Sequence, residues 1–368
     1  LFRSGLPVLV VEFADGTKRP YWNTFYQQVD VDGNGRKHYL GQMDLNINSP
    51  LVKEFYQQTL KTLAGYGAKI VRLDAFAYAP KEVGAKNFLN DPGTWDFLQE
   101  LTDMAQPYGM ALLPEIHASY EEGIYRVIGD KGYMVYDFFL PGLLLDAFEQ
   151  KSGQVLAQWA NEILSTGMQT VNMLGCHDGI PVLDLKGLLP EERIQGLIDT
   201  LVKRGGFVKD LHGAKNVYYQ VNATYYSALG EDDRRMLLAR ALQLFMPGKP
   251  QVWYLDLFAG KNDYEAMKRA GAGGHKEINR TNLSKEAMAE GLQKPVVQEQ
   301  LKLLKARATY PVFDSEAKIT VSAGGSQMRF AWEYAGQKAQ LDADLATCGF
   351  VATITDQATG EELFKMEQ

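Results

Sequence analysis

The chain has 368 residues, which is enough for one large core and a smaller additional domain. Its formal net charge of -7 offers no attractive long-range field to nucleic acid or to an anionic membrane surface, so neither is expected as a partner. Two cysteines are too few for a disulfide framework and suit a reducing, cytoplasmic compartment, and no apolar run is long enough to cross a bilayer.

Helical and strand patterns alternate from about residue 50 onward. Apolar residues at near-helical spacing predict a helix over 50–64, followed by a strand at 69–74. The unit recurs, with predicted helices at 93–105, 120–129, 153–164 and 231–245 and predicted strands at 110–115, 133–138, 168–174 and 250–255. Such alternation, with strands that are apolar throughout, indicates a parallel sheet covered by helices on both faces.

Two regions depart from the alternation. Residues 1–45 are irregular and rich in aromatic residues and glycine, whereas after a helix near 295–307 a period-two pattern predicts a small antiparallel β domain from about residue 312. Five predicted strands do not close an eight-stranded barrel. Two alternatives follow: the sheet is open, or the given chain lacks an N-terminal portion.

Three carboxylates each follow a short apolar run: Asp74, Glu115 and Asp178. In a β/α barrel the strands deliver side chains from their C-terminal ends onto one face, so acids far apart in sequence can converge on one substrate atom. Two of them suit glycosyl transfer, in which one carboxylate attacks the sugar and another handles the proton. The sequence therefore predicts an active site built on these acids.

The residues beside the first two acids support this interpretation and also leave alternatives. Arg72 lies two positions before Asp74, so in a strand both side chains point the same way. A buried structural ion pair is the alternative. Glu115 follows a proline and precedes Ile116, an apolar setting that favours the protonated acid of a proton donor, although a surface glutamate is the alternative.

The third acid has a histidine beside it. His177 next to Asp178 suits paired recognition of adjacent sugar hydroxyls, because one side chain can donate and the other accept. The alternative is an aspartate that caps the turn before Gly179.

Together these motifs resemble the α-amylase superfamily of glycoside hydrolases and transferases. Residues 72–76 resemble its nucleophile strand, 113–117 its acid/base strand and 176–179 the strand that carries an aspartate stabilising the transition state. Further strings resemble the sucrose phosphorylase branch, which includes members that act on sucrose 6F-phosphate: 79–82, 136–138, 219–222, 225–230, 259–263 and 278–280.

The resemblance implies a (β/α)8 TIM barrel with a small C-terminal antiparallel β domain. It implies retaining glucosyl transfer from sucrose or sucrose 6F-phosphate to inorganic phosphate, with Asp74 as nucleophile, Glu115 as acid and then base, and Asp178 as transition-state stabiliser. Further residues are implied to bind substrate: Arg72, His177, Arg280, Phe25, Gln28, Tyr219 and Gln220. For Phe25, an ordinary core aromatic is the alternative.

The resemblance also implies domain boundaries: 1–48 as an excursion between the third and fourth barrel strands, 49–311 as strands four to eight, and 312–368 as the β domain. The family's first three strands and their Asp...Asn-His motif have no counterpart in the sequence. We therefore expect a truncated enzyme with an open sheet edge and no activity of its own.

The loop at 209–218, which precedes Tyr219 and Gln220 and is called the acceptor loop below, departs from the pattern of the sucrose-specific members. Val217 stands about where those members place an aspartate that recognises fructose, and Lys209, His212 and Lys215 lie nearby. Basic residues suit a phosphorylated leaving group, although surface lysines are common.

The expected partners are a small sugar and inorganic phosphate. The five histidines show no metal-ligand spacing, so neither a metal nor another cofactor is expected. The oligomeric state is left open, with a homodimer as one alternative. Rival functions are a hydrolase or transglucosidase of the same fold, and a non-catalytic relative, which the three intact acids disfavour.

Overall fold

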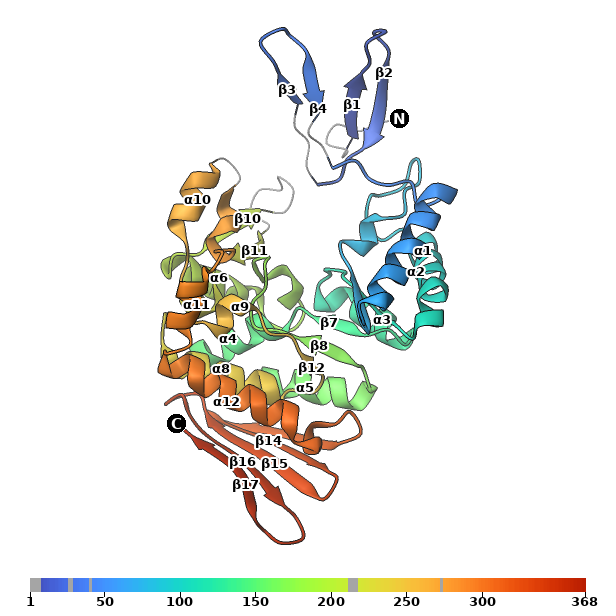
Figure 1. Cartoon of the computed structure of the whole chain (residues 1–368). Coiled ribbons are helices and arrows are strands. Elements are labelled where there is room, and N and C mark those ends of the chain that lie inside the picture. Colours follow the sequence, from blue (N-terminus) through green and yellow to red (C-terminus); the bar gives the residue numbers. More distant parts are fainter. Residues whose placement is uncertain (1–7, 26–28, 40–41, 211–217, 272–273) are drawn as a thin grey trace. The chain divides into compact units, whose positions relative to one another are not determined.

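The computed structural model describes residues 8–25, 29–39, 42–210, 218–271 and 274–368 (Figure 1). The chain forms two compact units, Leu1–Ile116 and His117–Gln368. In these described ranges, every helix is too short or too polar to cross a membrane.

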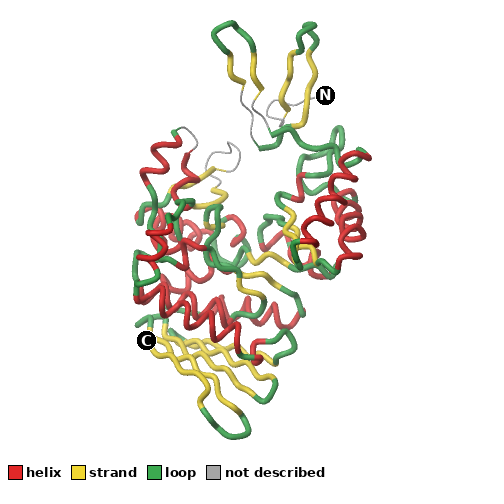
Figure 2. The backbone as a smooth tube through the Cα atoms, viewed as in Figure 1, coloured by secondary structure: helices red, strands yellow, loops and turns green. Residues whose placement is uncertain are grey.

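The first unit combines two β-hairpins with two helices and a parallel strand pair (Figure 2). Its elements in chain order are β1 (Val8–Glu12), β2 (Lys18–Trp22), β3 (Val29–Val31), β4 (Lys37–Tyr39), α1 (Pro50–Gly65), β5 (Ile70–Leu73), η1 (Phe76–Tyr78), α2 (Gly93–Ala105), η2 (Gln106–Tyr108) and β6 (Ala111–Pro114). The hairpins pair β1 with β2 and β3 with β4, and β5 runs parallel to β6.

Local sequence explains the helices of this unit. Pro50 occupies the first turn of α1, where its missing N–H costs nothing, and the helix gives way to Gly67 in the left-handed conformation. The helix α2 buries Phe97, Leu98 and Leu101 on one face. The predicted helices at 50–64 and 93–105, and the strands between and after them, are confirmed.

The second unit contains a parallel three-stranded sheet, a small antiparallel sheet and a five-stranded C-terminal sheet. Its first elements are η3 (Tyr120–Glu122), α3 (Ile124–Asp130), β7 (Val135–Asp137), α4 (Leu140–Gln150), α5 (Gln154–Thr166), β8 (Thr170–Asn172), β9 (Ile180–Pro181), η4 (Leu183–Leu185), α6 (Glu191–Lys203), β10 (Phe207–Asp210), β11 (Tyr218–Asn222) and α7 (Tyr225–Ala228). The others are α8 (Asp233–Phe245), β12 (Lys249–Pro250), α9 (Tyr254–Leu257), α10 (Tyr264–Ala270), η5 (Gly274–Asn279), α11 (Lys285–Gly291), α12 (Pro295–Thr309), η6 (Pro311–Phe313), β13 (Lys318–Gly324), β14 (Gln327–Tyr334), β15 (Gln337–Asp344), β16 (Gly349–Asp356) and β17 (Glu362–Glu367).

The parallel sheet has β8 at its centre, between β7 and β12. All residues of β7 and β8 are buried, as expected of strands covered on both faces. Helix α4 is buried from Leu140 to Phe148, and α8 is buried from Met236 to Phe245. These helices form the core on which the carboxyl end of β8 is supported.

Three details of the second unit correct the sequence prediction. The predicted strand at 250–255 is wrong beyond Pro250, because residues 254–257 form the short helix α9. Helices α4, α6, α7, α10 and α11 and the strands β9, β10 and β11 were not predicted. The C-terminal sheet has the strand order β13-β14-β15-β16-β17, so β15 and β17 add to the three strands that the period-two pattern indicated, at 319–321, 328–332 and 351–354. The domain boundaries at 48 and 311 stay a prediction.

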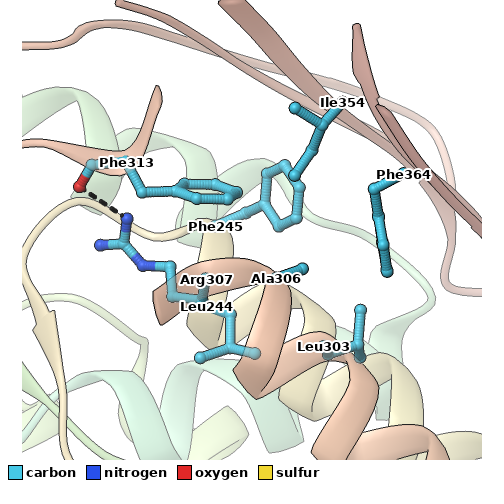
Figure 3. A pocket seen from close by; sticks show the side chains of 8 residues that line it. All are labelled: Leu244, Phe245, Leu303, Ala306, Arg307, Phe313, Ile354 and Phe364. Carbon is cyan, nitrogen blue, oxygen red and sulfur yellow. Dashed lines mark hydrogen bonds between the residues drawn. The ribbon is translucent and has the colours of Figure 1, made fainter. Parts of the chain in front are cut away.

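An arginine joins the C-terminal sheet to α12 (Figure 3). The guanidinium of Arg307 lies 4.7 Å from the ring centre of Phe313 and 4.6 Å from that of Trp332. It donates to the backbone oxygens of Phe313 and Gly248, each at 2.9 Å. Leu303 and Phe364 line the small apolar pocket beside it. Burial lowers the pKa of Arg307 to about 10, so the side chain stays charged at neutral pH.

Replacing Arg307 with methionine is expected to lower the free energy of unfolding by about 3 kcal/mol, because two charge-assisted hydrogen bonds and two cation–π contacts are lost. Urea denaturation of the variant measures this change. Lys305→Met, at an exposed position of the same helix, is the control and should change stability by less than about 0.5 kcal/mol. Equal effects of the two substitutions would contradict the assignment.

Candidate active site

Two of the predicted acids and one arginine come together in the first unit. Asp74 directly follows β5, Glu115 directly follows β6, and Arg72 lies within β5. The two strands are parallel, with Leu73 opposite Pro114, so their carboxyl ends lie side by side. Nη1 of Arg72 lies 2.5 Å from Oδ1 of Asp74, and Nη2 lies 2.8 Å from Oε1 of Glu115. One guanidinium therefore bridges both carboxylates.

The two acids differ in their exposure. The side chain of Asp74 is 73% exposed, whereas that of Glu115 is 8% exposed. An exposed carboxylate can be reached by a substrate, and a buried one is shielded from bulk water. Two neighbouring acids in different environments are the arrangement that divides a nucleophile from a proton-transferring group.

The residue after Asp74 supplies a contact that the sequence did not predict. Ala75 has a φ of 48°, in the left-handed region that non-glycine residues rarely adopt, and such a conformation costs about 1 kcal/mol or more. Its N–H donates to Oε2 of Glu115 at 2.7 Å. The sequence predicted an apolar setting for Glu115, and the structure corrects this: the side chain is buried, but Arg72 and Ala75 contact its two oxygens.

An aromatic pair lies near Glu115. The rings of Phe25 and Tyr78 meet edge to face, with centroids 5.2 Å apart. Burial raises the pKa of Tyr78, and the negative charge of Glu115 raises it further, so this tyrosine is within electrostatic range of the acid. Phe25 is 54% exposed, which is more than an ordinary core aromatic shows, and its role stays a prediction.

Lys81 fixes the segment that carries Phe25. Its Nζ donates to the backbone oxygen of Tyr78 and, at 3.2 Å, to Oγ1 of Thr24, and it lies 3.0 Å from Oδ2 of Asp44. The N–H of Thr24 donates to Oδ1 of Asp44 at 3.2 Å. These contacts tie the residue next to Phe25 to the loop after β5.

The predicted His-Asp pair and Arg280 come together in the second unit. Nη2 of Arg280 donates to Oδ1 of Asp178 at 3.3 Å, and Nε donates to the backbone oxygen of His177 at 2.7 Å. Nε2 of His177 lies 3.4 Å from Oδ2 of Asp178. Among the described residues, the carboxylate of Asp178 thus contacts two side chains, as a substrate-binding pair would, and the turn-capping alternative finds no support.

A buried asparagine that was not identified from the sequence donates hydrogen bonds to the backbone of the loop that carries His177 and Asp178. Nδ2 of Asn279 donates to the backbone oxygens of Cys176 and Asp178, at 2.9 and 2.7 Å. Asn279 is 1% exposed. Its only sequence signal was the string at 278–280, which was used for Arg280 alone; Lys81 likewise lay unremarked in the string at 79–82.

The same loop places three atoms of a type that can bind metal close together. The ligand atoms of Cys176, His177 and Asp178 lie within 4.8 Å of one another. The positive charge of Arg280 beside Asp178 opposes a bound cation, and structural zinc sites use four ligands. We still expect no metal here, and this expectation stays a prediction.

Of the remaining predicted site residues, the structure describes the side chain of Gln220 alone, on β11. Gln220 is 3% exposed and packs closely on Gly179, where an added Cβ would meet its side chain at 2.9 Å. The other predictions lie outside the described residues, either wholly or in their side chains: Gln28, His212 and Lys215, and the side chains of Lys209 and Tyr219.

Comparison with known proteins places the chain among phosphorylases. No family model matches it. It is 53% identical over 367 residues to a sucrose 6(F)-phosphate phosphorylase from Ilumatobacter coccineus, covering 97% of this chain and 69% of the relative. It is 34% identical over 362 residues to a glucosylglycerol phosphorylase from Marinobacter adhaerens, covering 96% and 71%. The chain belongs to the sucrose phosphorylase family.

Solved structures agree with this membership. The crystal structure of a sucrose 6F-phosphate phosphorylase from Thermoanaerobacter thermosaccharolyticum matches with a TM-score of 0.86 and 35% identity, over all of this chain and 71% of that one. An α-amylase from H. orenii matches with a TM-score of 0.54 at 14% identity, over 92% and 62%, and shows the fold alone. The predicted fold class, that of α-amylase-family TIM barrels with a C-terminal antiparallel sheet, is confirmed, and the described parallel strands of this chain form one pair and one three-stranded sheet.

The match to the sucrose phosphorylase family is partial in length. The chain spans about two thirds of the length of these relatives, for example 69% of the phosphorylase from Ilumatobacter coccineus. It spans 66% of a second sucrose 6(F)-phosphate phosphorylase, from Thermoanaerobacterium thermosaccharolyticum. The identity to that second protein is 37% over 339 residues, which is 90% of this chain. The relatives' names share phosphorolysis and differ in the glucoside cleaved.

Proposed function

We propose that the complete protein transfers a glucosyl group from sucrose 6F-phosphate or sucrose to inorganic phosphate, with retention of configuration. The observation that carries the proposal is the bridge from Arg72 to both Asp74 and Glu115. Retaining enzymes hold their two carboxyl groups about 5 to 5.5 Å apart, and two acids that share one guanidinium are held at short range. Inverting enzymes need a wider gap that admits a water molecule.

In the first step, a carboxylate oxygen of Asp74 attacks the anomeric carbon and forms a glucosyl ester. The glycosidic carbon–oxygen bond breaks, and the departing fructosyl oxygen takes the proton of Glu115. In the second step, a phosphate oxygen attacks the same carbon and displaces Asp74, while Glu115 accepts the phosphate proton. Two inversions give net retention, and the product is α-D-glucose 1-phosphate.

The second group of residues is assigned to glucose recognition. His177, Asp178 and Arg280 present donors and acceptors to sugar hydroxyls, and Asp178 supplies negative charge for the positive charge that develops on the ring in the transition state. Phe25 supplies an apolar wall for the glucosyl ring. Gln28, Tyr219 and Gln220 are proposed as further contacts on the sequence resemblance alone.

Product analysis tests the proposal. The complete protein is incubated with sucrose 6F-phosphate, sucrose or no donor, each with and without inorganic phosphate, and the sugar phosphates are identified by NMR. Formation of α-glucose 1-phosphate that requires phosphate is the expected result. Free glucose formed at the same rate without phosphate would indicate the hydrolase instead, which the names of the relatives do not favour.

The phosphorylated donor is proposed as the preferred one. Two relatives are named for it, at 53% and 37% identity, and Lys209, His212 and Lys215 make the acceptor loop basic in an acidic protein. A cytoplasmic location also stays a prediction, as does a homodimer.

His212→Ala is expected to lower kcat/KM for sucrose 6F-phosphate by roughly ten- to a hundredfold, because one charge-assisted contact of about 1.5 to 3 kcal/mol is lost. The kcat/KM for sucrose should change far less, because sucrose offers no anion to that side chain. Initial rates on both donors measure the difference. If the wild-type protein prefers sucrose, or if His212→Ala lowers kcat/KM equally on both donors, the acceptor loop does not bind a phosphate and is structural.

A further inference from the structure

A fully buried acid lies beneath the loop that carries His177 and Asp178. Asp256, on α9, is 1% exposed, and Arg240, on α8, is 0% exposed. Burial of a charge is costly unless other groups compensate it. Nε of Arg240 donates to Oε1 of Gln300 at 2.9 Å, and Nη1 donates to Oε1 of Gln243.

Asp256 contacts the loop directly. Its Oδ2 accepts a hydrogen bond of 2.7 Å from the N–H of Gly175, the residue before Cys176. The approach is so close that a Cβ at Gly175 would lie 2.8 Å from Oδ1 of Asp256. A larger residue at position 175 would therefore displace the carboxylate of Asp256 from this hydrogen bond.

The helix that carries Arg240 also holds the strand from which the loop emerges. Nε2 of Gln243 donates to the backbone oxygen of Asn172, the last residue of β8, at 3.3 Å, and to that of Gln251 at 2.9 Å. Gly175 lies three residues beyond Asn172. The polar groups of α8 and α9 thus fix the chain on both sides of Met173 and Leu174.

We propose that Asp256 is a positioning residue, which sets the His177-Asp178 loop through the N–H of Gly175. The inference rests on the proposed function only in that His177 and Asp178 bind the glucosyl group. Asp256 touches no reacting atom itself. It acts through the backbone of the loop, to which Asn279 and Arg280 also donate hydrogen bonds.

The electrostatics agree with this geometry. Burial raises the pKa of Asp256 to about 6, although the charge of Arg240 and the N–H of Gly175 both favour the ionised form. Burial lowers the pKa of Arg240 to about 10, although the charge of Asp256 favours the protonated form. Both groups are therefore charged at neutral pH.

Hydrogen exchange and kinetics of variants of the complete protein test the proposal. In Asp256→Ala, exchange of the Gly175 amide, followed by mass spectrometry of peptides spanning 173–179, should quicken at least about tenfold, because its acceptor is lost. On sucrose 6F-phosphate and sucrose, kcat should fall by roughly a hundredfold and KM should change by less than about threefold, because Asp178 acts mainly in the transition state.

Asp146→Asn is the matched control. Asp146 is 3% exposed and accepts from Nε of Arg193 at 3.1 Å, so it is another buried acid of the same unit, with no described contact to the loop. It should leave Gly175 exchange and kcat unchanged. Gly175→Ala tests the same contact from the other side, since its Cβ displaces the carboxylate, and it decides the matter if Asp256→Ala does not fold.

Unchanged exchange at Gly175 in a folded Asp256→Ala or Gly175→Ala variant would overturn the proposal. So would a loss of kcat that the Asp146→Asn control reproduces, because it would reflect general destabilisation. If the wild-type protein forms no sugar phosphate from either donor, the proposed function fails, and the exchange measurement still decides whether Asp256 positions the loop.

Discussion

Asp74→Asn is expected to reduce glucosyl transfer in the complete protein by several orders of magnitude, because an amide does not attack the anomeric carbon as a carboxylate does. The fold should survive, since the side chain is 73% exposed and its described ion pair is with Arg72 alone. Initial rates of phosphorolysis measure the loss. Mass spectrometry after incubation with a slowly turned-over fluorinated glucosyl donor should show an adduct on the wild-type peptide 70–78 and none on the variant.

Asp103→Asn is the control for this experiment. Asp103 is an exposed acid on α2 in the same unit, and its described hydrogen bond is to Gln99. The control should retain wild-type activity. A glucosyl adduct that still forms on Asp74→Asn would show that another residue is the nucleophile.

Glu115→Gln should separate donors by the proton that their leaving groups need. With sucrose or its 6F-phosphate the departing oxygen must be protonated, and loss of the acid should cost roughly a hundred- to ten-thousandfold. Fluoride leaves glucosyl fluoride without a proton, so the first turnover with that donor should slow by less than about tenfold. The initial burst of fluoride release measures this step separately from transfer to phosphate.

Glu100→Gln, which removes a carboxylate paired with Lys53 in the same unit, provides the comparison. It should react at the wild-type rate with every donor. If Glu115→Gln loses equal activity on sucrose and on glucosyl fluoride, Glu115 has another role, such as holding Arg72 and the N–H of Ala75 in place.

Hydrophobic spacing and turn residues in the sequence predicted those helices and strands whose apolar residues recur at regular intervals. Helix α2 was predicted with the bounds it has, because apolar residues recur at helical spacing between a proline and a glycine turn. The run from Pro250 to Leu255 failed because a short apolar stretch suits a strand and a buried helix equally well. Helix α4 is buried continuously from Leu140 to Phe148, so it lacks the exposed polar face that marks an amphipathic helix.

Strand β15 of the C-terminal sheet was not predicted, because its buried side chains are mostly small. In β15 the buried positions are Ala339, Leu341 and Ala343, and two alanines give little hydrophobic contrast with the polar residues between them. The strand is specified by its partners β14 and β16, with which it is paired along its whole length. Such pairing is a property of the folded sheet rather than of the segment.

In the candidate site, too, contacts between residues close in sequence were predicted, and contacts between distant residues were not. The spacing of Arg72 and Asp74 predicted their contact, because alternate residues of a strand share a face. The link from Arg72 to Glu115, which are 43 residues apart, required the pairing of β5 with β6, and the support of Gly175 by Asp256 spans 81 residues. No local pattern carries contacts of that range.

The shared guanidinium has a consequence for the stereochemistry of the product. A guanidinium is a flat, rigid plate whose two terminal nitrogens sit at a fixed separation, so Arg72 acts as a spacer between the oxygens of Asp74 and Glu115 that contact it. Lysine carries the same charge on a single nitrogen, so it cannot hold two carboxylate oxygens at a fixed separation in this way. In the proposed mechanism, the anomeric configuration of the sugar phosphate would thus be set in part by the breadth of one arginine, a residue that forms no bond to the sugar carbon.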